Sequence, residues 1–168
     1  GLPLLVYRPP SFSGDGIVRL IEKLMAVENI VGLKYTGSSY FEMWRLLQIN
    51  DGNINVINGA DETLLCGLVT GADGGIGAIY NVIPGEFTTL YRAFKAGDLA
   101  TAKKHQERIC RVIDTMIRFI RGAGIILPLK ALLKKQGMDV GMPVFPAQDY
   151  SEAEREELLS AFDTAMRV

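Results

Sequence analysis

Short apolar runs alternate with stretches of helical periodicity along the first half of the chain, and this alternation restricts the fold more than any other feature. The apolar runs cover residues 2–7, 30–36, 54–59 and 74–81. Apolar residues at helical spacing follow the first three runs, at 15–27, 38–48 and 61–71. Strands that are apolar on both faces and separated by helices are typical of a parallel sheet covered by helices.

The second half of the chain has no strand signal. Helical patterns cover residues 85–97, 98–120, 127–137 and 151–166. Asp98 is predicted to be an N-cap, and Ser151 with Glu154 has the spacing of a capping box. In the first half, Ser39 with Glu42 has the same spacing, and Gly71 is placed to end a helix.

Four successive βα units predict half of a (β/α)₈ barrel followed by a helical extension. A complete barrel needs about 250 residues, which is more than the 168 of this chain. We expect the half-barrel to cover residues 1–84, and the last barrel helix with a helical bundle to cover 85–168. A four-stranded doubly wound sheet is the alternative. That fold normally has a glycine-rich phosphate loop after its first strand, where this chain reads YRPPSFSG.

Composition and charge exclude several classes of function. The formal net charge is −1 and the isoelectric point is near 5.9, which disfavours a nucleic-acid or anionic-membrane surface. No apolar run has the length that a membrane-spanning helix needs. Cys66 and Cys110 lack the spacing of metal ligands and are interpreted as buried free thiols in a reducing compartment, which predicts a cytoplasmic protein. His105, the only histidine, is expected on a solvated helix surface.

Lys34 stands in VGLKYTGS, a strand with no carboxylate to pair with its amine. Gly32 and Thr36 share its face of the strand, because alternate residues of a strand point to the same side. A strand-end lysine that reaches solvent is one interpretation. The other is catalytic, since the carboxyl ends of barrel strands carry the chemistry and an amine there is a nucleophile for carbonyl carbons.

Four segments in order resemble the pyruvate-dependent class I aldolases, the family that includes N-acetylneuraminate lyase and dihydrodipicolinate synthase. They are LPLLVYRPPSFSG, GLKYTG, INGADETLL and GADGGIGAIYNV. The resemblance covers nearly the whole chain and assigns it to strands five to eight of the barrel and the helices that follow. The family's first half-barrel, with the loop that holds the pyruvate carboxylate, has no counterpart here. We therefore expect a longer protein, or a complementary half from another polypeptide or another copy of the chain.

The resemblance implies roles for seven residues. Lys34 would form a Schiff base with the keto acid, and Tyr7 would relay a proton. The substrate tail would be bound by Thr36, Gly59, Asp61, Glu62 and Ala78. Four of them have a structural alternative: Tyr7 as a core tyrosine, Thr36 as an ordinary β-branched strand residue, and Asp61 as the cap of the following helix with Glu62 in its first turn.

The chain departs from the family pattern at several positions. Arg8 follows Tyr7 where an asparagine is usual, and Pro9–Pro10 replaces a single proline. Ala78 stands in place of a serine of the lyase, which removes one hydroxyl contact to the substrate. Phe12 stands where the synthase branch has an arginine for its dicarboxylic substrate. This last departure favours a neutral or sugar-like aldehyde.

The sequence therefore predicts a Schiff-base aldolase that cleaves N-acetylneuraminate or a related 2-keto-3-deoxy sugar acid to pyruvate and an aldehyde. No metal or other cofactor is expected. The expected partners are the keto acid substrate and a complementary half-barrel, in a homo-oligomer without nucleic acid or membrane. Two alternatives stay open: an inactive half-barrel that serves as a structural module, because open sheet edges demand a partner, and a dihydrodipicolinate synthase-like enzyme.

Overall fold

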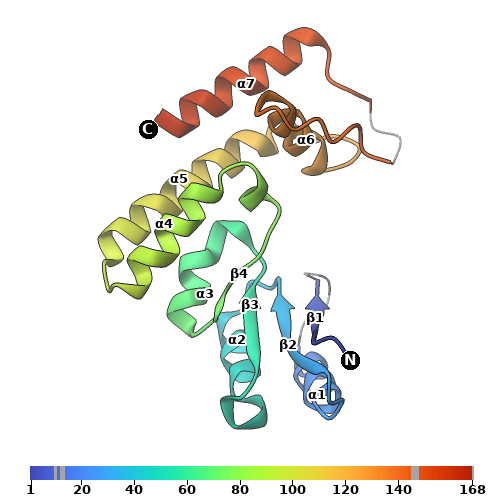
Figure 1. Cartoon of the computed structure of the whole chain (residues 1–168), viewed down its shortest axis with the longest axis vertical. Helices are drawn as coiled ribbons and strands as arrows, with labels where there is room; N and C mark the ends of the chain where they lie inside the picture. Colours follow the sequence, from blue (N-terminus) through green and yellow to red (C-terminus); the bar gives the residue numbers. More distant parts are fainter. Residues whose placement is uncertain (10, 12–13, 145–147, 168) are drawn as a thin grey trace. The chain divides into compact units, whose positions relative to one another are not determined.

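The computed structural model describes residues 1–9, 11, 14–144 and 148–167. The chain divides into two compact units, residues 1–77 and residues 78–168. The first contains the sheet and the second contains helices (Figure 1). The expected division of the chain into 1–84 and 85–168 remains a prediction.

The first unit is a four-stranded parallel sheet whose strands follow chain order, β1-β2-β3-β4. Its strands are β1 Leu4–Arg8, β2 Ile30–Tyr35, β3 Asn55–Asn58 and β4 Gly74–Gly75, and its helices are α1 Asp15–Leu24, α2 Tyr40–Leu47 and α3 Leu64–Thr70. A doubly wound sheet reverses its strand order at a switch point, and this sheet does not. These four parallel strands, with the helices between them, therefore form half of a barrel, as the sequence predicted.

One face of the sheet is buried under helices. Leu33 and Tyr35 of β2 are fully buried there, together with Ile21 of α1 and Met43 of α2. The opposite face is open: Tyr7 of β1, for example, is 56% exposed. Successive strand residues point to opposite faces, so Lys34, between Leu33 and Tyr35, belongs to the open face.

The fourth strand is shorter than predicted. Residues 74–81 were expected to form one strand, but β4 has only two residues, and Ile79–Asn81 forms a 3-10 helix (η3). Glycines weaken a strand because they bring no side chain to pack. Asn81 also favours a turn, since its side-chain and backbone N–H groups both donate to the Ala78 carbonyl, at 2.9 and 3.2 Å.

The described residues of the second unit form four α-helices, α4 Pro84–Lys95, α5 Leu99–Ile117, α6 Ile126–Lys135 and α7 Glu152–Arg167, after the short 3-10 helix η3. The caps predicted for helices of this unit are confirmed. Asp98 accepts a hydrogen bond from the Thr101 N–H at 3.0 Å. Ser151 and Glu154 bond to each other's backbone N–H groups at the start of α7, at 3.3 and 2.7 Å. In the first unit, Gly71 ends α3 with a left-handed φ of 118°.

His105 corrects a sequence prediction. Its side chain is only 18% exposed, and its Nδ1 lies 2.6 Å from Glu86 Oε2, so it links α5 to α4. Arg108 donates to the same carboxylate at 3.1 Å. Burial alone would raise the pKa of Glu86, but the hydrogen bonds from His105 and Arg108 outweigh it and lower that pKa. The solvated surface expected at His105 is therefore wrong.

The two cysteines differ in exposure, and the sequence prediction for one of them fails. Cys66 is an exposed thiol and Cys110 is half-buried, so the expected burial of Cys66 is wrong. Both are unbridged, as predicted. Every helix in the described part of the chain is too short or too polar to span a bilayer.

Gly32 allows β2 to approach β3 closely. A Cβ atom added at Gly32 would overlap the Asn55 carbonyl oxygen, a backbone atom that cannot step aside. We expect Gly32→Ala to lower the free energy of unfolding, measured by urea denaturation, by about 1–3 kcal/mol or more. Gly74→Ala is the matched control in the same sheet, because no heavy atom lies within 4 Å of its added Cβ. An equal loss of stability in both variants would contradict this account of Gly32.

Candidate functional site

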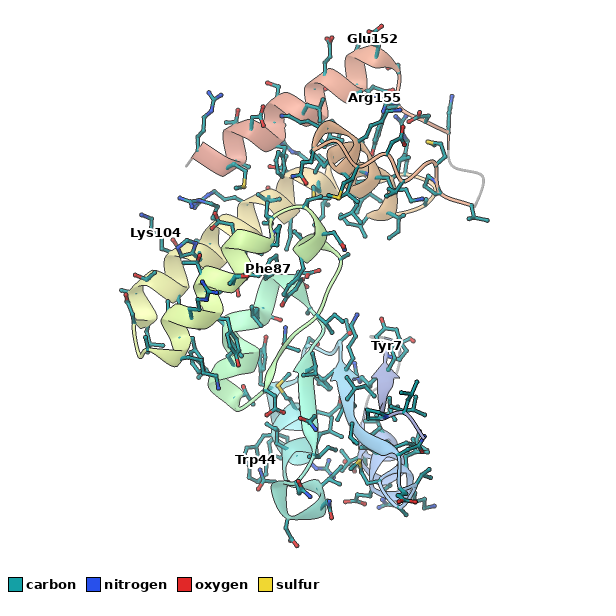
Figure 2. All side chains as sticks on the ribbon, viewed as in Figure 1. Tyr7, Trp44, Phe87, Lys104, Glu152 and Arg155 are labelled. Atoms are coloured by element: carbon teal, nitrogen blue, oxygen red, sulfur yellow. The ribbon has the colours of Figure 1, made fainter. Side chains whose placement is uncertain are left out.

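Lys34 and Tyr7 meet on the open face of the sheet. β1 and β2 pair in parallel with Tyr7 opposite Lys34. The Lys34 Nζ lies 4.9 Å from the centroid of the Tyr7 ring, within the range of a cation–π contact. Both residues lie near the carboxyl ends of their strands, where Figure 2 labels Tyr7. The structure therefore brings the two predicted catalytic residues together.

Gly59 provides the space that Lys34 and Thr36 occupy. Its N–H donates to the Tyr35 carbonyl at 2.7 Å, which draws the end of β3 against β2. A Cβ atom at this position would lie 2.9 Å from Lys34 Cε and would overlap Thr36 Oγ1. That hydroxyl is buried and has no hydrogen-bond partner in the described part of the chain. Thr36 can therefore offer its hydroxyl to a ligand, and its contact with a substrate remains a prediction.

The turn after β3 carries the two predicted carboxylates. Asp61–Thr63 forms a 3-10 turn (η2), and α3 begins only at Leu64 with Thr63 as its N-cap. Asp61 is therefore not the N-cap of that helix. Its carboxylate instead packs against Gly77, where an added Cβ would overlap it. Glu62, by contrast, is exposed.

Asn58 shapes this turn, and the sequence analysis missed it. Its side chain is buried, and its Nδ2 donates to the Ala60 carbonyl at 2.7 Å, which fixes the chain between Gly59 and Asp61. The available signal was a polar residue that follows two apolar ones, Val56 and Ile57, at the end of the strand.

A pocket of about 300 Å³ lies at the carboxyl ends of the strands, beside this turn. Two predicted residues, Thr36 and Glu62, line it, and three of the other lining residues carry hydroxyl groups on a surface that is largely apolar. The lining residues are Arg8, Thr36, Gly37, Ser38, Ser39, Ala60, Glu62 and Thr63. Such a lining offers hydrogen-bond donors and acceptors to a ligand rich in hydroxyl groups.

Arg8 borders this pocket, and its arrangement was not foreseen from the sequence. The guanidinium is buried and forms an ion pair with Glu42 at 2.7 Å, in which both side chains are less than a tenth exposed. The Glu42 N–H donates to Ser39 Oγ at 3.1 Å, as a capping box requires. The Glu42 carboxylate, however, binds Arg8 and the Gly14 N–H rather than completing the box. The capping box is therefore only half formed.

The neighbouring tyrosine, Tyr35, belongs to the covered face and is not an acid–base candidate. Its phenol donates to the Ser39 carbonyl at 2.8 Å. Burial, reinforced by the nearby Glu42 carboxylate, raises the pKa of Tyr35 to about 12. This phenol therefore keeps its proton at physiological pH, and Tyr7 is the tyrosine that faces Lys34.

Two sequence expectations have no test at this site. Ala78 belongs to the second unit, where its carbonyl accepts the hydrogen bonds from Asn81, and its contact with a substrate remains a prediction. Pro10 and Phe12 lie outside the described residues. The argument from Phe12 against a dicarboxylic substrate is therefore still a prediction as well.

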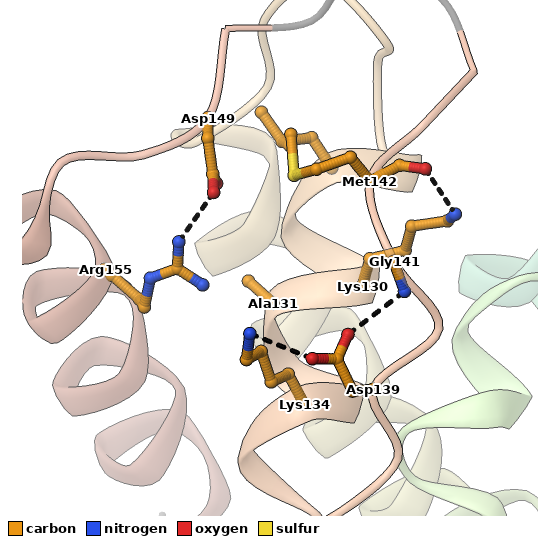
Figure 3. Close-up of a pocket in the computed structure, with 9 residues that line it drawn as sticks. Lys130, Ala131, Lys134, Asp139, Gly141, Met142, Asp149 and Arg155 are labelled. Carbon is orange, nitrogen blue, oxygen red and sulfur yellow. Dashed lines mark hydrogen bonds and ion pairs between the residues drawn. The ribbon is translucent and has the colours of Figure 1, made fainter.

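The second unit contains a pocket of its own, between α6, α7 and the segment that joins them (Figure 3). Its charged side chains are already paired. Lys134 binds Asp139 and Arg155 binds Asp149, both at 2.9 Å, while Lys130 donates to the Met142 carbonyl. The charged residues that line this pocket therefore have protein partners already. Throughout the described residues, no three His, Cys, Asp or Glu side chains are grouped as metal ligands.

Comparison with known proteins identifies the family. The model of the dihydrodipicolinate synthetase family matches residues 1–165. N-acetylneuraminate lyase 2 of Escherichia coli O6:H1 is 34% identical over 145 residues, which are 86% of this chain and 46% of the relative. N-acetylneuraminate lyase of an Enterobacter species is 34% identical over 134 residues, 79% of this chain and 43% of the relative.

Solved structures agree on the fold. An N-acetylneuraminate lyase of Proteus mirabilis superposes with a TM-score of 0.86 at 22% identity, over 97% of this chain and 55% of that one. A dihydrodipicolinate synthase of Bacillus anthracis gives 0.81 at 27% identity, over 97% and 55%. The chain thus spans about half the length of the proteins it matches, in keeping with half a barrel. It belongs to the dihydrodipicolinate synthetase family.

Proposed function

We propose that this chain carries the Schiff-base half of a class I aldolase. The observation that carries the proposal is the contact between the Lys34 amine and the Tyr7 ring, on the open face of the sheet near the strand ends. A primary amine and a phenol at this distance supply a nucleophile for a carbonyl and a group that can relay protons. Family membership adds independent support, because curated relatives are N-acetylneuraminate lyases.

In the proposed reaction the Lys34 amine attacks the keto carbon, and loss of water leaves a protonated imine. When the carbon–carbon bond breaks, its electron pair moves toward the imine nitrogen and an enamine remains. The hydroxyl on the departing carbon loses its proton as the aldehyde forms, and the Tyr7 phenol relays this proton. Protonation of the enamine and hydrolysis of the imine then release pyruvate and restore the amine. The imine accelerates cleavage because it takes up the electron pair in the transition state.

We propose that the substrate is a sugar acid, whose aldehyde portion carries several hydroxyl groups. The lining of the pocket beside Lys34's strand includes hydroxyl groups and the Glu62 carboxylate. Its one cationic side chain among the lining residues, Arg8, is already paired with Glu42. A carboxylate-bearing aldehyde would find no free cation in this lining, whereas polyhydroxy groups would find acceptors and donors. N-acetylneuraminate or a related 2-keto-3-deoxy sugar acid is therefore the proposed substrate. The cytoplasm remains the proposed location of the protein.

Catalysis is proposed to need the complementary half of the barrel. Leu4 and Leu5 on β1 are about half exposed, as is Ile76 after β4. Covering such apolar surface is favourable, by roughly 25 cal/mol per Å². The loop that would hold the pyruvate carboxylate in this family also lies in the other half. We therefore place the active site in an assembly with that half, from the same or another polypeptide, within a homo-oligomer.

Replacing Lys34 tests the assigned chemistry. In the assembled protein we expect Lys34→Ala to reduce pyruvate release from N-acetylneuraminate by on the order of 10³-fold or more, because Lys34 supplies the amine that lies over the Tyr7 ring. Stability should change by less than about 1 kcal/mol, since Lys34 is only partly buried. Lys23→Ala, on the exposed side of α1, is the matched control. Cleavage that survives in Lys34→Ala would refute the Schiff base at this residue.

Gly59→Ala tests the space around the amine. The new methyl group would meet Thr36 Oγ1 and Lys34 Cε, so both side chains must move. We expect the turnover number for cleavage to fall about tenfold to a hundredfold, the cost of a misplacement of about 1 Å. Gly74→Ala, which meets no atom, should retain the parent rate. If both variants turn over at the parent rate, Gly59 has no part in placing Lys34.

Light scattering after size exclusion, combined with the cleavage assay, tests the need for a second half. We expect these 168 residues alone to associate through their open sheet and to lack cleavage activity, and to gain activity when the complementary half is supplied. A monodisperse monomer of this chain with full activity would contradict the proposed assembly.

A further inference from the structure

Two cation–aromatic contacts stand at successive positions of the β1–β2 pair, on opposite faces. On the open face, Lys34 of β2 lies over Tyr7 of β1. On the covered face the order is reversed, with the Arg8 guanidinium of β1 lying 4.8 Å from the centroid of Tyr35 of β2. The strands pair Tyr7 with Lys34 and Arg8 with Tyr35. A shift of one contact along the strands therefore shifts the other.

Arg8 holds the backbone of Thr36 from both sides. Its carbonyl accepts from the Thr36 N–H at 3.1 Å, and its Nη1 donates to the Thr36 carbonyl at 3.2 Å. Thr36 follows Lys34 by two residues and presents its hydroxyl toward the position of Gly59. Arg8 is thus hydrogen-bonded to the end of β2, the segment that carries both the Lys34 amine and the Thr36 hydroxyl.

Glu42 anchors Arg8 to the remaining parts of this unit. Its Oε1 accepts from Arg8 Nη2 and its Oε2 accepts from the Gly14 N–H, each at 2.7 Å. This carboxylate therefore joins α2 to the end of β1 and to the start of α1. Gly37 leaves room for the arrangement: a Cβ there would lie 2.6 Å from Arg8 Nη1 and 2.5 Å from the Tyr35 hydroxyl.

We propose that Arg8 is a positioning residue that, through its ion pair with Glu42 and its grip on Thr36, holds the Lys34 amine against Tyr7. It acts through other residues, because its side chain lies on the face opposite Lys34. The inference rests on the proposed function only for its effect on rate. The geometry it asserts, the placement of the amine over the Tyr7 ring, can be measured without catalysis.

The test compares two double variants of the assembled protein. Arg8→Met/Glu42→Met removes both buried charges together, so neither is left unpaired, and such replacements are often neutral for stability. Asp15→Met/Arg45→Met removes another ion pair between α1 and α2, one that lies on the surface, and is the control. Gly37→Ala provides a third variant, which displaces the guanidinium without removing a charge.

Two readouts separate positioning from a purely structural role. The first is the rate at which pyruvate and borohydride trap the imine on Lys34, with kcat and KM for cleavage. The second is the ¹³C resonance of Lys34 after reductive methylation, assigned by its loss in Lys34→Arg. The Tyr7 ring shifts this resonance, and Tyr7→Leu gives its position without the ring.

We expect the Arg8/Glu42 double variant to unfold at a urea concentration close to that of the parent, yet to trap the imine about ten- to a hundredfold more slowly. The loss should appear in kcat more than in KM, and the Lys34 resonance should move toward its position in Tyr7→Leu. The control should match the parent in both readouts. Gly37→Ala, if the double variant does not fold, is expected to change both readouts in the same direction.

If a folded Arg8/Glu42 or Gly37 variant traps the imine on Lys34 at the same rate as the parent protein, the proposal is overturned. If the parent protein itself forms no imine, the proposed function fails, and the resonance alone decides the positioning role. A resonance that moves then supports Arg8 as the residue that holds the amine, and an unmoved resonance overturns it.

Discussion

The parallel pairing of β1 with β2 is the interaction on which the rest of this unit depends. It sets Tyr7 opposite Lys34 and Arg8 opposite Tyr35. Because side chains alternate between faces, a slip of one residue would turn Lys34 into the hydrophobic core and Tyr35 out of it. Burial of Leu33 and Tyr35 beneath α1 and α2 makes that slip costly. The core thereby fixes the face on which the amine stands.

Glycines then determine how closely the strand ends approach. Gly32 admits the Asn55 carbonyl, Gly59 admits the side chains of Lys34 and Thr36, and Gly77 admits Asp61. At each position an added Cβ would collide with the neighbour. The missing side chains of these glycines shape the proposed site as much as the side chains that are present.

The sequence predicted what depends on local pattern. Periodicity gave the four βα units and the helical second half, and short spacings gave the caps at Asp98 and Ser151. Resemblance to a family gave Lys34 and Tyr7, which the fold brings together. The sequence could not predict contacts between distant segments. Arg8 forms an ion pair with Glu42, 34 positions away, and His105 contacts Glu86 on another helix. The same pairing competes with the expected capping box, because Glu42 has one carboxylate and uses it for Arg8 and Gly14.

We propose that Lys34 is the residue that forms a covalent bond to pyruvate. Peptide mapping by mass spectrometry, after the assembled protein is treated with pyruvate and borohydride, tests it most directly. We expect a reduced pyruvate adduct on the peptide that contains Lys34, and none on that peptide when borohydride is added before pyruvate. An adduct confined to another lysine, or none from protein that is cleaving substrate, would contradict it.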